Sequence, residues 1–225
     1  YFNDIDTSNT VEGKPVYYWV NKQDMTVPAD AGYVGLVNCT RIMVQDLSLT
    51  KNGEGLLLAF TSNTTITRNN ITNNLNGIVG YNSARTPASL GNIIFENMIA
   101  NNGGSGVAFG WNSYNNTFSG NNITNNQGWG LAGGYLATIS GNNIKNNYVG
   151  IDVGFSSVIS GNNVTENTYI GITLGSATYG NTISGNNITN NGPRAFSSFA
   201  YPIAAGIDLS GTSYNIISGN NIENN

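Results

Sequence analysis

The sequence contains no histidine and only one cysteine, Cys39. A single thiol can form no intrachain disulfide, and we expect Cys39 to be a small buried hydrophobic residue rather than a reactive thiol. Transition-metal sites draw on His, Cys and Met side chains, and the three methionines, Met25, Met43 and Met98, are isolated in the sequence. We therefore predict no metal site, no cofactor and no metallochaperone function.

Charged residues are also scarce, at 9% of the chain, and the net charge is −4. Nucleic-acid binding needs basic patches, so we expect no nucleic-acid partner. No apolar run approaches the ~18 residues of a membrane span, and we predict none in this chain. The chain begins at Tyr1 rather than Met, which favours a processed protein or a fragment whose signal peptide is not visible.

Asparagine and glycine dominate the composition instead, with 40 Asn and 29 Gly. Together they form about a third of the chain, so turns must recur often. Hydrophobic residues make up 39% of the chain, which is enough for one sizeable core. Length and composition fit one domain or an elongated array.

A nine-residue motif recurs along the chain. Its clearest copy is "ISGNNITNN" at residues 183–191, and further copies start at residues 44, 66, 94, 118, 139, 159 and 217. Each copy is followed by a second short motif, such as "GIDV" at 150–153. Units of about 20–24 residues, with short strands between Asn/Gly turns, are typical of a solenoid. The pattern predicts an all-β chain folded as a single-stranded parallel β-helix of about 8–9 coils.

The predicted boundaries follow from where the repeat is regular. The first forty residues lack the motif, so we predict residues 1–40 to be an atypical N-terminal cap segment on the first coil. Residues 41–225 then form the coils of a single domain, with insertions near 82–92 and 192–205. The sequence stops inside a repeat, which favours either a chain that continues past Asn225 or a second subunit docked at that end.

Comparing the copies assigns each position of the motif to a face. The first and sixth positions are apolar and are predicted to point inward, whereas the third, fifth and eighth are predicted to face solvent. The ninth position is Asn in every copy and is expected to be a turn residue with positive φ. The fourth position holds Leu47 in the outermost coil, which implies that it points inward. Its amides are expected to hydrogen-bond from coil to coil as a buried ladder, formed by Asn69, Asn97, Asn121, Asn142, Asn162, Asn186 and Asn220.

These repeats resemble the right-handed parallel β-helix families related to the periplasmic copper-binding protein NosD and to carbohydrate-binding and sugar-hydrolase β-helix proteins. The stretches "NTVEGKPVYYWVN" at 9–21 and "AGYVGLVNCTRIMVQDL" at 31–47 are similar to the start of archaeal surface proteins of this type. The resemblance covers essentially the whole chain and implies a right-handed β-helix. It implies no particular activity, because this fold carries lyases, hydrolases, adhesins and structural proteins alike. Copper binding is not carried over, because the chain lacks the ligands.

Asp152 and Asp208 are the best candidates for catalytic residues. Each is the third residue of a "GID" strand and is predicted to point away from the core, with Thr173 between them in the same column. A separation of two coils is about 9–10 Å, near the upper end of carboxyl separations in inverting glycosidases. No cluster of Arg, Lys or Asp accompanies them. We therefore expect acidic decoration of an outer sheet and assign no catalytic residue.

Two further columns are candidate binding surfaces. An outward column formed by Leu57, Val79, Ala108 and Ala132 would be an exposed apolar patch, and we expect the chain itself to cover it. A second column carries aromatic side chains on successive coils and is expected to be a corner of the core, with a sugar-binding ridge as the alternative. Its members are Leu90, Tyr114, Tyr135, Phe155 and Tyr179, with Tyr214 one place off.

Seven N-x-[ST] sequons make N-glycosylation a further expectation, with partial occupancy at most. Four of them fall on the outward fifth position of the motif. Asn163 and Asn187 lie on adjacent coils, about 4.8 Å apart, where two glycans would crowd each other. The seven acceptors are Asn38, Asn63, Asn70, Asn115, Asn122, Asn163 and Asn187.

The sequence favours an extracellular or cell-surface β-helix with a structural or adhesive role. Exposed strand edges at the ends of the solenoid predict self-association into a filament, sheath or surface layer. The alternative is a carbohydrate-binding or polysaccharide-cleaving β-helix. The scaffold-like repeat favours a protein that is not an enzyme, with a second copy or surface glycans as its partners.

Overall fold

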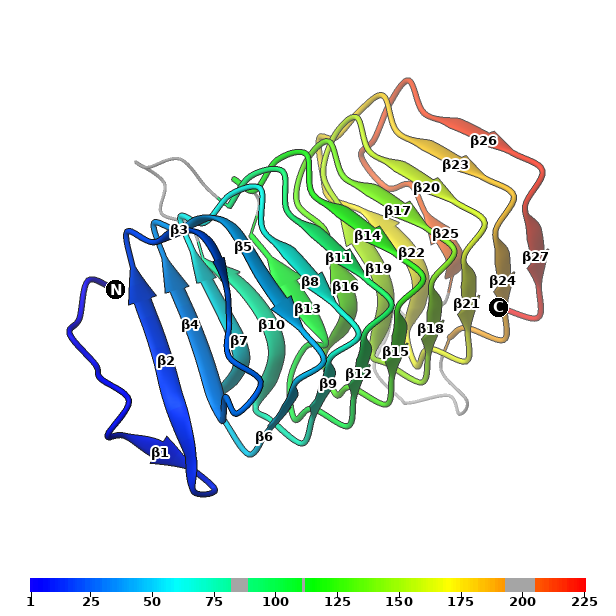
Figure 1. The fold of residues 1–225 in the computed structure, drawn as a ribbon. Coiled ribbons are helices and arrows are strands. Elements are labelled where there is room, and N and C mark those ends of the chain that lie inside the picture. Colours follow the sequence, from blue (N-terminus) through cyan, green and yellow to red (C-terminus); the bar gives the residue numbers. More distant parts are fainter. Residues whose placement is uncertain (82–88, 111, 193–204) are drawn as a thin grey trace.

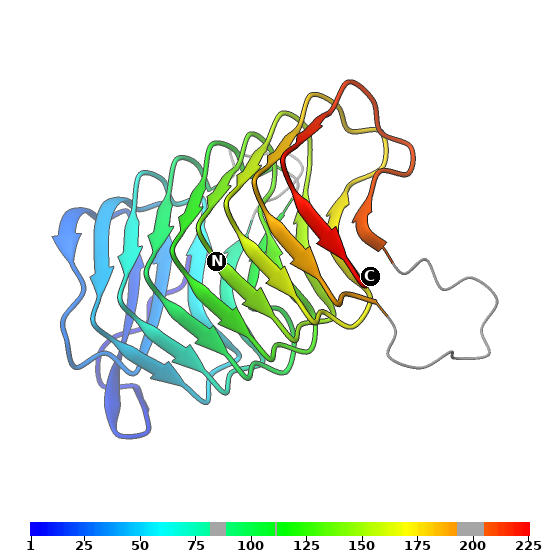
Figure 2. The same ribbon diagram turned by 90° about the vertical axis from the view of Figure 1, so that its right-hand side faces the viewer.

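The structure is a computed structural model that describes residues 1–81, 89–110, 112–192 and 205–225. All regular secondary structure in these residues is β-strand. The chain winds as a parallel β-helix, with its first coils at one end and its last coils at the other (Figure 1). Each coil has three sides, and each side belongs to a different sheet (Figure 2). In the described part of the chain, no helix has the length and apolar character needed to cross a membrane.

Sheet I is the 10-stranded sheet. Its strands pair in parallel apart from β1, which is antiparallel to β2. In spatial order it contains β1 (Thr10–Val11), β2 (Lys14–Val20), β4 (Tyr33–Val37), β7 (Glu54–Ala59), β10 (Asn76–Tyr81), β13 (Val107–Phe109), β16 (Trp129–Ala132), β19 (Val149–Val153), β22 (Ile170–Leu174) and β25 (Ala205–Asp208).

Sheets II and III are the other two sides of the solenoid. Sheet II contains β3 (Gln23–Thr26), β5 (Thr40–Gln45), β8 (Thr65–Thr67), β11 (Ile93–Phe95), β14 (Thr117–Ser119), β17 (Thr138–Ser140), β20 (Val158–Ser160), β23 (Thr182–Ser184) and β26 (Ile216–Ser218). Sheet III contains β6 (Ser48–Thr50), β9 (Asn70–Thr72), β12 (Met98–Ala100), β15 (Asn122–Thr124), β18 (Asn143–Lys145), β21 (Asn163–Thr165), β24 (Asn187–Thr189) and β27 (Asn221–Glu223). From β4 onward, the chain visits sheets I, II and III in turn, so three consecutive strands make one coil.

The core is a stack of aliphatic side chains that repeat from coil to coil. Ile139 pairs with Ile159 on sheet II, and Ile144 pairs with Val164 on sheet III, and all four are fully buried. These residues occupy the first and sixth positions of the motif, which therefore point inward as the pattern predicts. Stacking like residues at a spacing of about 4.8 Å buries one continuous core.

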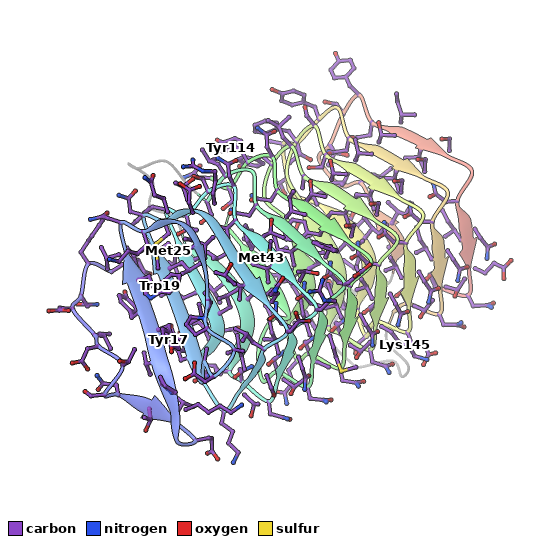
Figure 3. The ribbon with its side chains drawn as sticks, viewed as in Figure 1. Tyr17, Trp19, Met25, Met43, Tyr114 and Lys145 are labelled. Atoms are coloured by element: carbon purple, nitrogen blue, oxygen red, sulfur yellow. The ribbon has the colours of Figure 1, made fainter. Side chains whose placement is uncertain are left out.

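The N-terminal strands belong to the same sheets as the repeats. β2 pairs in parallel with β4, and β3 pairs in parallel with β5, so parallel pairing begins well before residue 41. Tyr17 and Trp19 of β2 are partly buried against this end of the core (Figure 3). Most of the two predicted insertions, residues 82–88 and 193–204, lies outside the described residues.

A ladder of buried asparagine side chains follows the corner between sheets II and III. Asn142 is representative: its Oδ1 accepts the backbone N–H and the Nδ2 of Asn121 at 2.9 and 3.0 Å. Its own Nδ2 donates to the Phe118 carbonyl and to Asn162 Oδ1, both at 2.9 Å. Each internal amide of the ladder thus joins neighbouring coils, and its own oxygen and nitrogen are hydrogen-bonded. The same pattern runs through Asn69, Asn97, Asn121, Asn162, Asn186 and Asn220.

The ninth position of the motif forms a second buried ladder, and our expectation of a turn residue with positive φ was wrong. Positive φ belongs to the eighth position, as at Asn146 with φ 56°. The following Asn147 is buried, and its Nδ2 donates to the Ile123 carbonyl and to Asn167 Oδ1, both at 3.1 Å. The left-handed residue bends the chain around the corner between sheets III and I. This bend carries the next side chain into the interior.

The corner between sheets I and II uses the same device. Asn115 has φ 58° and faces solvent. The next residue, Asn116, is buried, and its Oδ1 accepts the backbone N–H and the Nδ2 of Asn92 at 2.9 and 3.1 Å. On later coils, Asn181 Nδ2 donates to Asn215 Oδ1 at 3.1 Å. The corners on either side of sheet III therefore carry a buried amide on successive coils, whereas the corner between sheets I and II alternates amides with Thr64, Ala137 and Ser157.

Removing one amide from the first ladder tests how much the corner depends on it. We expect Asn142→Ala to destabilise the protein by about 2–4 kcal/mol, because the Asn121 donors and the Phe118 carbonyl lose a buried partner. Asn143→Ala is the matched control, because the adjacent amide lies on the outer face, where water replaces its bonds at a cost below about 1 kcal/mol. Urea unfolding followed by circular dichroism measures both losses. Equal losses in the two variants would contradict a special role for the buried ladder.

Candidate functional site

A groove with a volume of about 510 Å³ lies on the outer face of sheet I. Its floor is the outward column of Val79, Ala108, Ala132 and Asp152, on four consecutive strands from β10 to β19. The three apolar members are half-buried, whereas Leu57 of the same column is only 6% exposed. The chain therefore covers the start of the predicted apolar column and leaves the rest as the floor of a groove.

Asp152 is the charged member of this floor. It pairs with Ala132 on β16 and with Thr173 on β22. The Asp152 carboxylate has no hydrogen-bond or ion-pair partner among the described residues, although the side chain is half-buried. Burial raises the pKa of Asp152 to about 6, because a desolvated site disfavours the charged form. An unpartnered carboxyl of this kind is ready to accept hydrogen bonds from a ligand.

Thr178 adds a second unpartnered polar group to the groove. Its side chain is 7% exposed, and its Oγ1 has no hydrogen-bond partner in the described structure. Thr178 and Ser176 both line the groove, in the segment that follows β22. Buried polar groups are normally hydrogen-bonded, but the Thr178 oxygen is closed off from solvent and Ser113, in the same column outside the groove, is unpartnered in the same way, so this hydroxyl is part of the wall and not a contact for a ligand.

The aromatic column lies outside the core, which corrects our expectation for it. The rings of Tyr135 and Phe155 stack with centroids 4.2 Å apart, and Tyr114 approaches Tyr135 at 5.5 Å. Tyr179 stacks on Phe155 at 5.7 Å and is 52% exposed, and Tyr214 is 87% exposed. Tyr135 and Phe155 also line the groove. The column is therefore a ridge on the surface, as in the alternative of a sugar-binding ridge, and sugar binding by it stays a prediction.

The turn geometry explains why these rings stay outside. Tyr114 lies at the edge of the solenoid (Figure 3) and immediately precedes Asn115, the residue with positive φ. The inward direction begins only after that residue, at Asn116. The aromatic residues therefore remain on the outer side of the corner, where Tyr135 and Phe155 form part of the edge of the groove.

Trp129 borders the groove on the side of sheet III, and the sequence comparison missed it. It opens β16, pairs with Val149 of β19 and is 45% exposed. The next two coils hold Val149 and Ile170 at the equivalent position. A single aromatic residue followed by aliphatic residues on the next coils was therefore the signal in the sequence that could have identified Trp129. Nearby, Tyr148 and Tyr169 stack at 5.3 Å, but neither lines the groove.

Asp208 lies in the same column as Asp152 but not in the same site. Thr173 separates them, since it pairs with Asp152 on one side and with Asp208 on the other. Asp208 does not line the groove, and its Oδ1 accepts hydrogen bonds from the Ser210 backbone N–H and hydroxyl at 2.9 and 2.6 Å. The two predicted candidates therefore share a column without forming one carboxylate pair in the groove.

No Lys or Arg of the described residues lines the groove. Arg41 and Arg68 form ion pairs with Asp24 and Asp46. Lys145, on sheet III (Figure 3), pairs with a glutamate on the next coil at 2.7 Å. The electrostatic character of the groove is therefore set by Asp152 alone among the residues that the structure describes.

The outward asparagines of sheet III bear on the predicted glycosylation sites. Asn143 Nδ2 donates to Asn122 Oδ1 at 2.8 Å, and Asn163 Nδ2 donates to Asn143 Oδ1 at 2.9 Å. Asn187 Nδ2 in turn donates to Asn163 Oδ1 at 2.8 Å. Three of the seven sequon amides thus belong to an outer ladder, whereas Asn70 is exposed beside Met98. Glycosylation at any of the seven stays a prediction.

The residues that could bind a soft metal do not come together. The Cys39 thiol is buried, contacts the carbonyls of Trp19 and Val37 at 3.3 and 3.4 Å, and has its pKa raised by burial. Met25 and Met43 lie on neighbouring strands of sheet II (Figure 3), whereas Met98 lies on sheet III. Among the described residues, no group of three or more His, Cys, Asp or Glu could hold a metal ion.

Several solved structures share this fold. A point mutant of the periplasmic alginate epimerase AlgG aligns with a TM-score of 0.68 at 16% identity, over 93% of this chain and 51% of that protein. The A-module of mannuronan C-5 epimerase AlgE6 from Azotobacter vinelandii aligns with a TM-score of 0.59 at 16% identity, over 92% of this chain and 56% of the module. ORF18 of Geobacillus virus E2 aligns with a TM-score of 0.64 at 16% identity, over 92% of this chain and 43% of that protein. The chain thus spans about half the length of these proteins, and at this identity the likeness shows the fold alone.

Family comparisons agree with the repeat pattern. Residues 130–225 match the right-handed β-helix region, and residues 7–149 match the family described as periplasmic copper-binding protein (NosD). No curated protein matches the sequence. The residues present do not fit a copper ion, because the chain has no histidine, Cys39 is buried and Met98 lies on a different sheet from Met25 and Met43. The match to NosD nevertheless covers more than half of the sequence, and this right-handed parallel β-helix belongs to the NosD family.

Proposed function

We propose that this protein binds an extended glycan in the groove on sheet I. The observation that carries the proposal is Asp152, a half-buried carboxyl without a partner among the described residues, in a groove bordered by Trp129. Aromatic rings pack against the apolar faces of sugar rings, and carboxylates accept hydrogen bonds from sugar hydroxyls. The groove is lined from five consecutive coils, a length of about 19 Å that suits several sugar units.

The similar solved structures are a reason to test this protein against polysaccharides, but they do not identify which polysaccharide it binds. Two of the similar solved proteins are named as epimerases of alginate or mannuronan. This chain shares their fold at 16% identity, and a fold by itself assigns no substrate. The proposal for this chain therefore stands on its own groove.

The proposal is for binding without a catalytic step. A carboxyl with a raised pKa is a suitable general acid, but hydrolysis of a glycosidic bond by the usual route needs a second carboxylate across the substrate. Among the described residues that line the groove, Asp152 is the single carboxylate. Asp208, the second candidate, lies outside the groove and is engaged by Ser210.

A location outside the cytoplasm fits this role. The family is described as periplasmic, and we propose that this chain is secreted or displayed at the cell surface, where it meets glycans. We also propose that the chain is a surface protein of the archaeal type and that some of its seven sequons carry glycans.

Self-association through the ends of the solenoid is a second candidate function. Ile217 and Ile222 occupy inward positions of the last described coil and are 40% and 48% exposed. The strands that carry them, β26 and β27, each pair on one side only. Such an end accepts a further coil of matching register from the same or another molecule.

Replacing the aromatic border of the groove tests glycan binding. We expect Trp129→Ala to weaken binding by roughly tenfold, because the sugar loses a large apolar contact. Tyr148→Ala is the matched control: it removes an exposed aromatic ring from the same region, but outside the groove. Affinity electrophoresis through gels with embedded polysaccharides, followed by calorimetry on the retained ones, measures both. Equal weakening by the two variants would place the binding surface elsewhere.

The buried carboxyl in the groove predicts a pH-dependent stability. Burial raises the pKa of Asp152 from 3.8 to about 6, so the folded protein holds this proton more tightly than the unfolded chain. This contribution to stability is present below pH about 4 and is lost as the pH rises through 6. Asp152→Asn should therefore be more stable than the parent protein at pH 7.5, by about 2 kcal/mol, and should lose that advantage at pH 4. Urea unfolding at both pH values measures it. An equal difference in the free energy of unfolding between the variant and the parent protein at the two pH values would exclude a buried carboxyl that titrates near pH 6.

End-to-end association predicts a mass that rises with concentration. Light scattering coupled to size exclusion should show this rise for the parent protein and its absence in Ile222→Lys, which puts a charge on the exposed end. Leu75→Lys, at another exposed apolar residue, is the control and should leave the rise unchanged. A parent protein that stays monomeric at every concentration would remove this candidate.

A further inference from the structure

We propose that the groove selects neutral glycans and rejects polyuronates, through the charge of Asp152 and the absence of a compensating cation among the described residues that line it. The inference rests on the proposed glycan binding and adds a substrate class to it. It also separates this chain from the two similar solved proteins named for alginate or mannuronan, because both of those polymers are built of uronic acids.

The charges around the groove carry the first step. A protein that binds a polyanion normally supplies Arg or Lys at the site, since a carboxylate is best held by a charge-assisted bond. No described Lys or Arg lines this groove. Arg41, Arg68 and Lys145 are already held in ion pairs elsewhere on the solenoid. A uronate carboxylate would therefore meet no Lys or Arg among the described residues that line the groove.

Repulsion by Asp152 is the second step. Its carboxyl lies on the floor of the groove and is partly withdrawn from water. Like charges repel more strongly in such a site than in bulk water, because the effective dielectric constant is lower. The carboxylate of a uronate unit bound beside Asp152 would be repelled by the Asp152 carboxylate, and no described Lys or Arg in the groove would offset this repulsion.

The hydrogen-bonding groups carry the third step. The Asp152 carboxylate lacks a partner among the described residues, and Ser176 is exposed in the wall of the groove. These two groups match the hydroxyls of a neutral sugar, which donate to a carboxylate and exchange hydrogen bonds with a hydroxyl. The apolar floor and the rings of Trp129 and Phe155 match the C–H faces of the sugar ring. A neutral glycan can hydrogen-bond to Asp152 and Ser176 without adding a charge.

The test compares neutral and uronate polymers on the same protein. Affinity for soluble xylan, mannan and mixed-linkage glucan is measured beside affinity for polymannuronate and polygalacturonate, at pH 7.5 and low salt. We expect at least tenfold tighter binding to one of the neutral polymers than to either polyuronate. The ratio of the affinity for the neutral polymer to the affinity for the polyuronate should fall severalfold or more in Asp152→Asn. Asp208→Asn removes the same charge from the same column outside the groove, and should leave the ratio unchanged.

The outcomes separate the two proposals. Tight binding of polyuronate by the parent protein would overturn the selection for neutral glycans and leave glycan binding in the groove intact. A ratio that stays the same in Asp152→Asn, or that narrows equally in Asp208→Asn, would overturn the role of Asp152. Retention of none of the polymers would overturn the glycan-binding function and this inference together.

Discussion

The buried side-chain amides stacked at the corners of the coils are the interaction on which the rest of this structure depends. A three-sided coil of about 22 residues must bend sharply three times, and every bend leaves backbone N–H and C=O groups that the sheets do not pair. Asn142 shows the solution, because one amide accepts from the coil on one side, donates to the coil on the other and also binds a backbone carbonyl. Burial without such partners would be costly at every corner. The abundance of asparagine follows from this need.

The outer faces are free to vary because the corners and the core hold the solenoid together. Sheet III carries an outer row of hydrogen-bonded asparagines, whereas sheet I carries a groove in which Asp152 and Trp129 replace the small or aliphatic residues of neighbouring coils. A groove on a rigid sheet face keeps its groups in fixed positions. Binding then requires little ordering of the protein, which favours recognition of an extended chain.

The fold could be predicted from the sequence because the copies of the motif can be compared with one another. Leu47 at the fourth position of the outermost coil was enough to place the asparagines of that column inside. The ninth position misled the comparison, because an invariant Asn fits a turn residue and a buried ladder equally well. Only the backbone shows that Asn146 has the positive φ and that Asn147 points inward.

The candidate site was harder to predict from the sequence, because Asp152 and Trp129 occur on single coils and are not repeated from one coil to the next. Asp152 was chosen from its place in an outward column, but its unpartnered state depends on neighbours on other coils. The aromatic column was assigned to the core because its direction is reversed by the single left-handed residue that follows each ring, as Asn115 follows Tyr114. Trp129 stands in no repeated column of aromatic residues. Thr178 belongs to a recurring column of buried Ser and Thr residues, with Thr61, Ser89 and Ser113, that the comparison of the motif copies did not single out. The importance of Trp129 appears only when the groove brings it together with Asp152.

A crystal structure of the protein soaked with a neutral oligosaccharide is the direct test of glycan binding in the groove. We expect sugar density along the groove of sheet I, with a hydroxyl within hydrogen-bonding distance of the Asp152 carboxylate and a sugar ring against Trp129. Sugar bound only outside the groove, or a groove that stays free of sugar at saturating concentration, would contradict it.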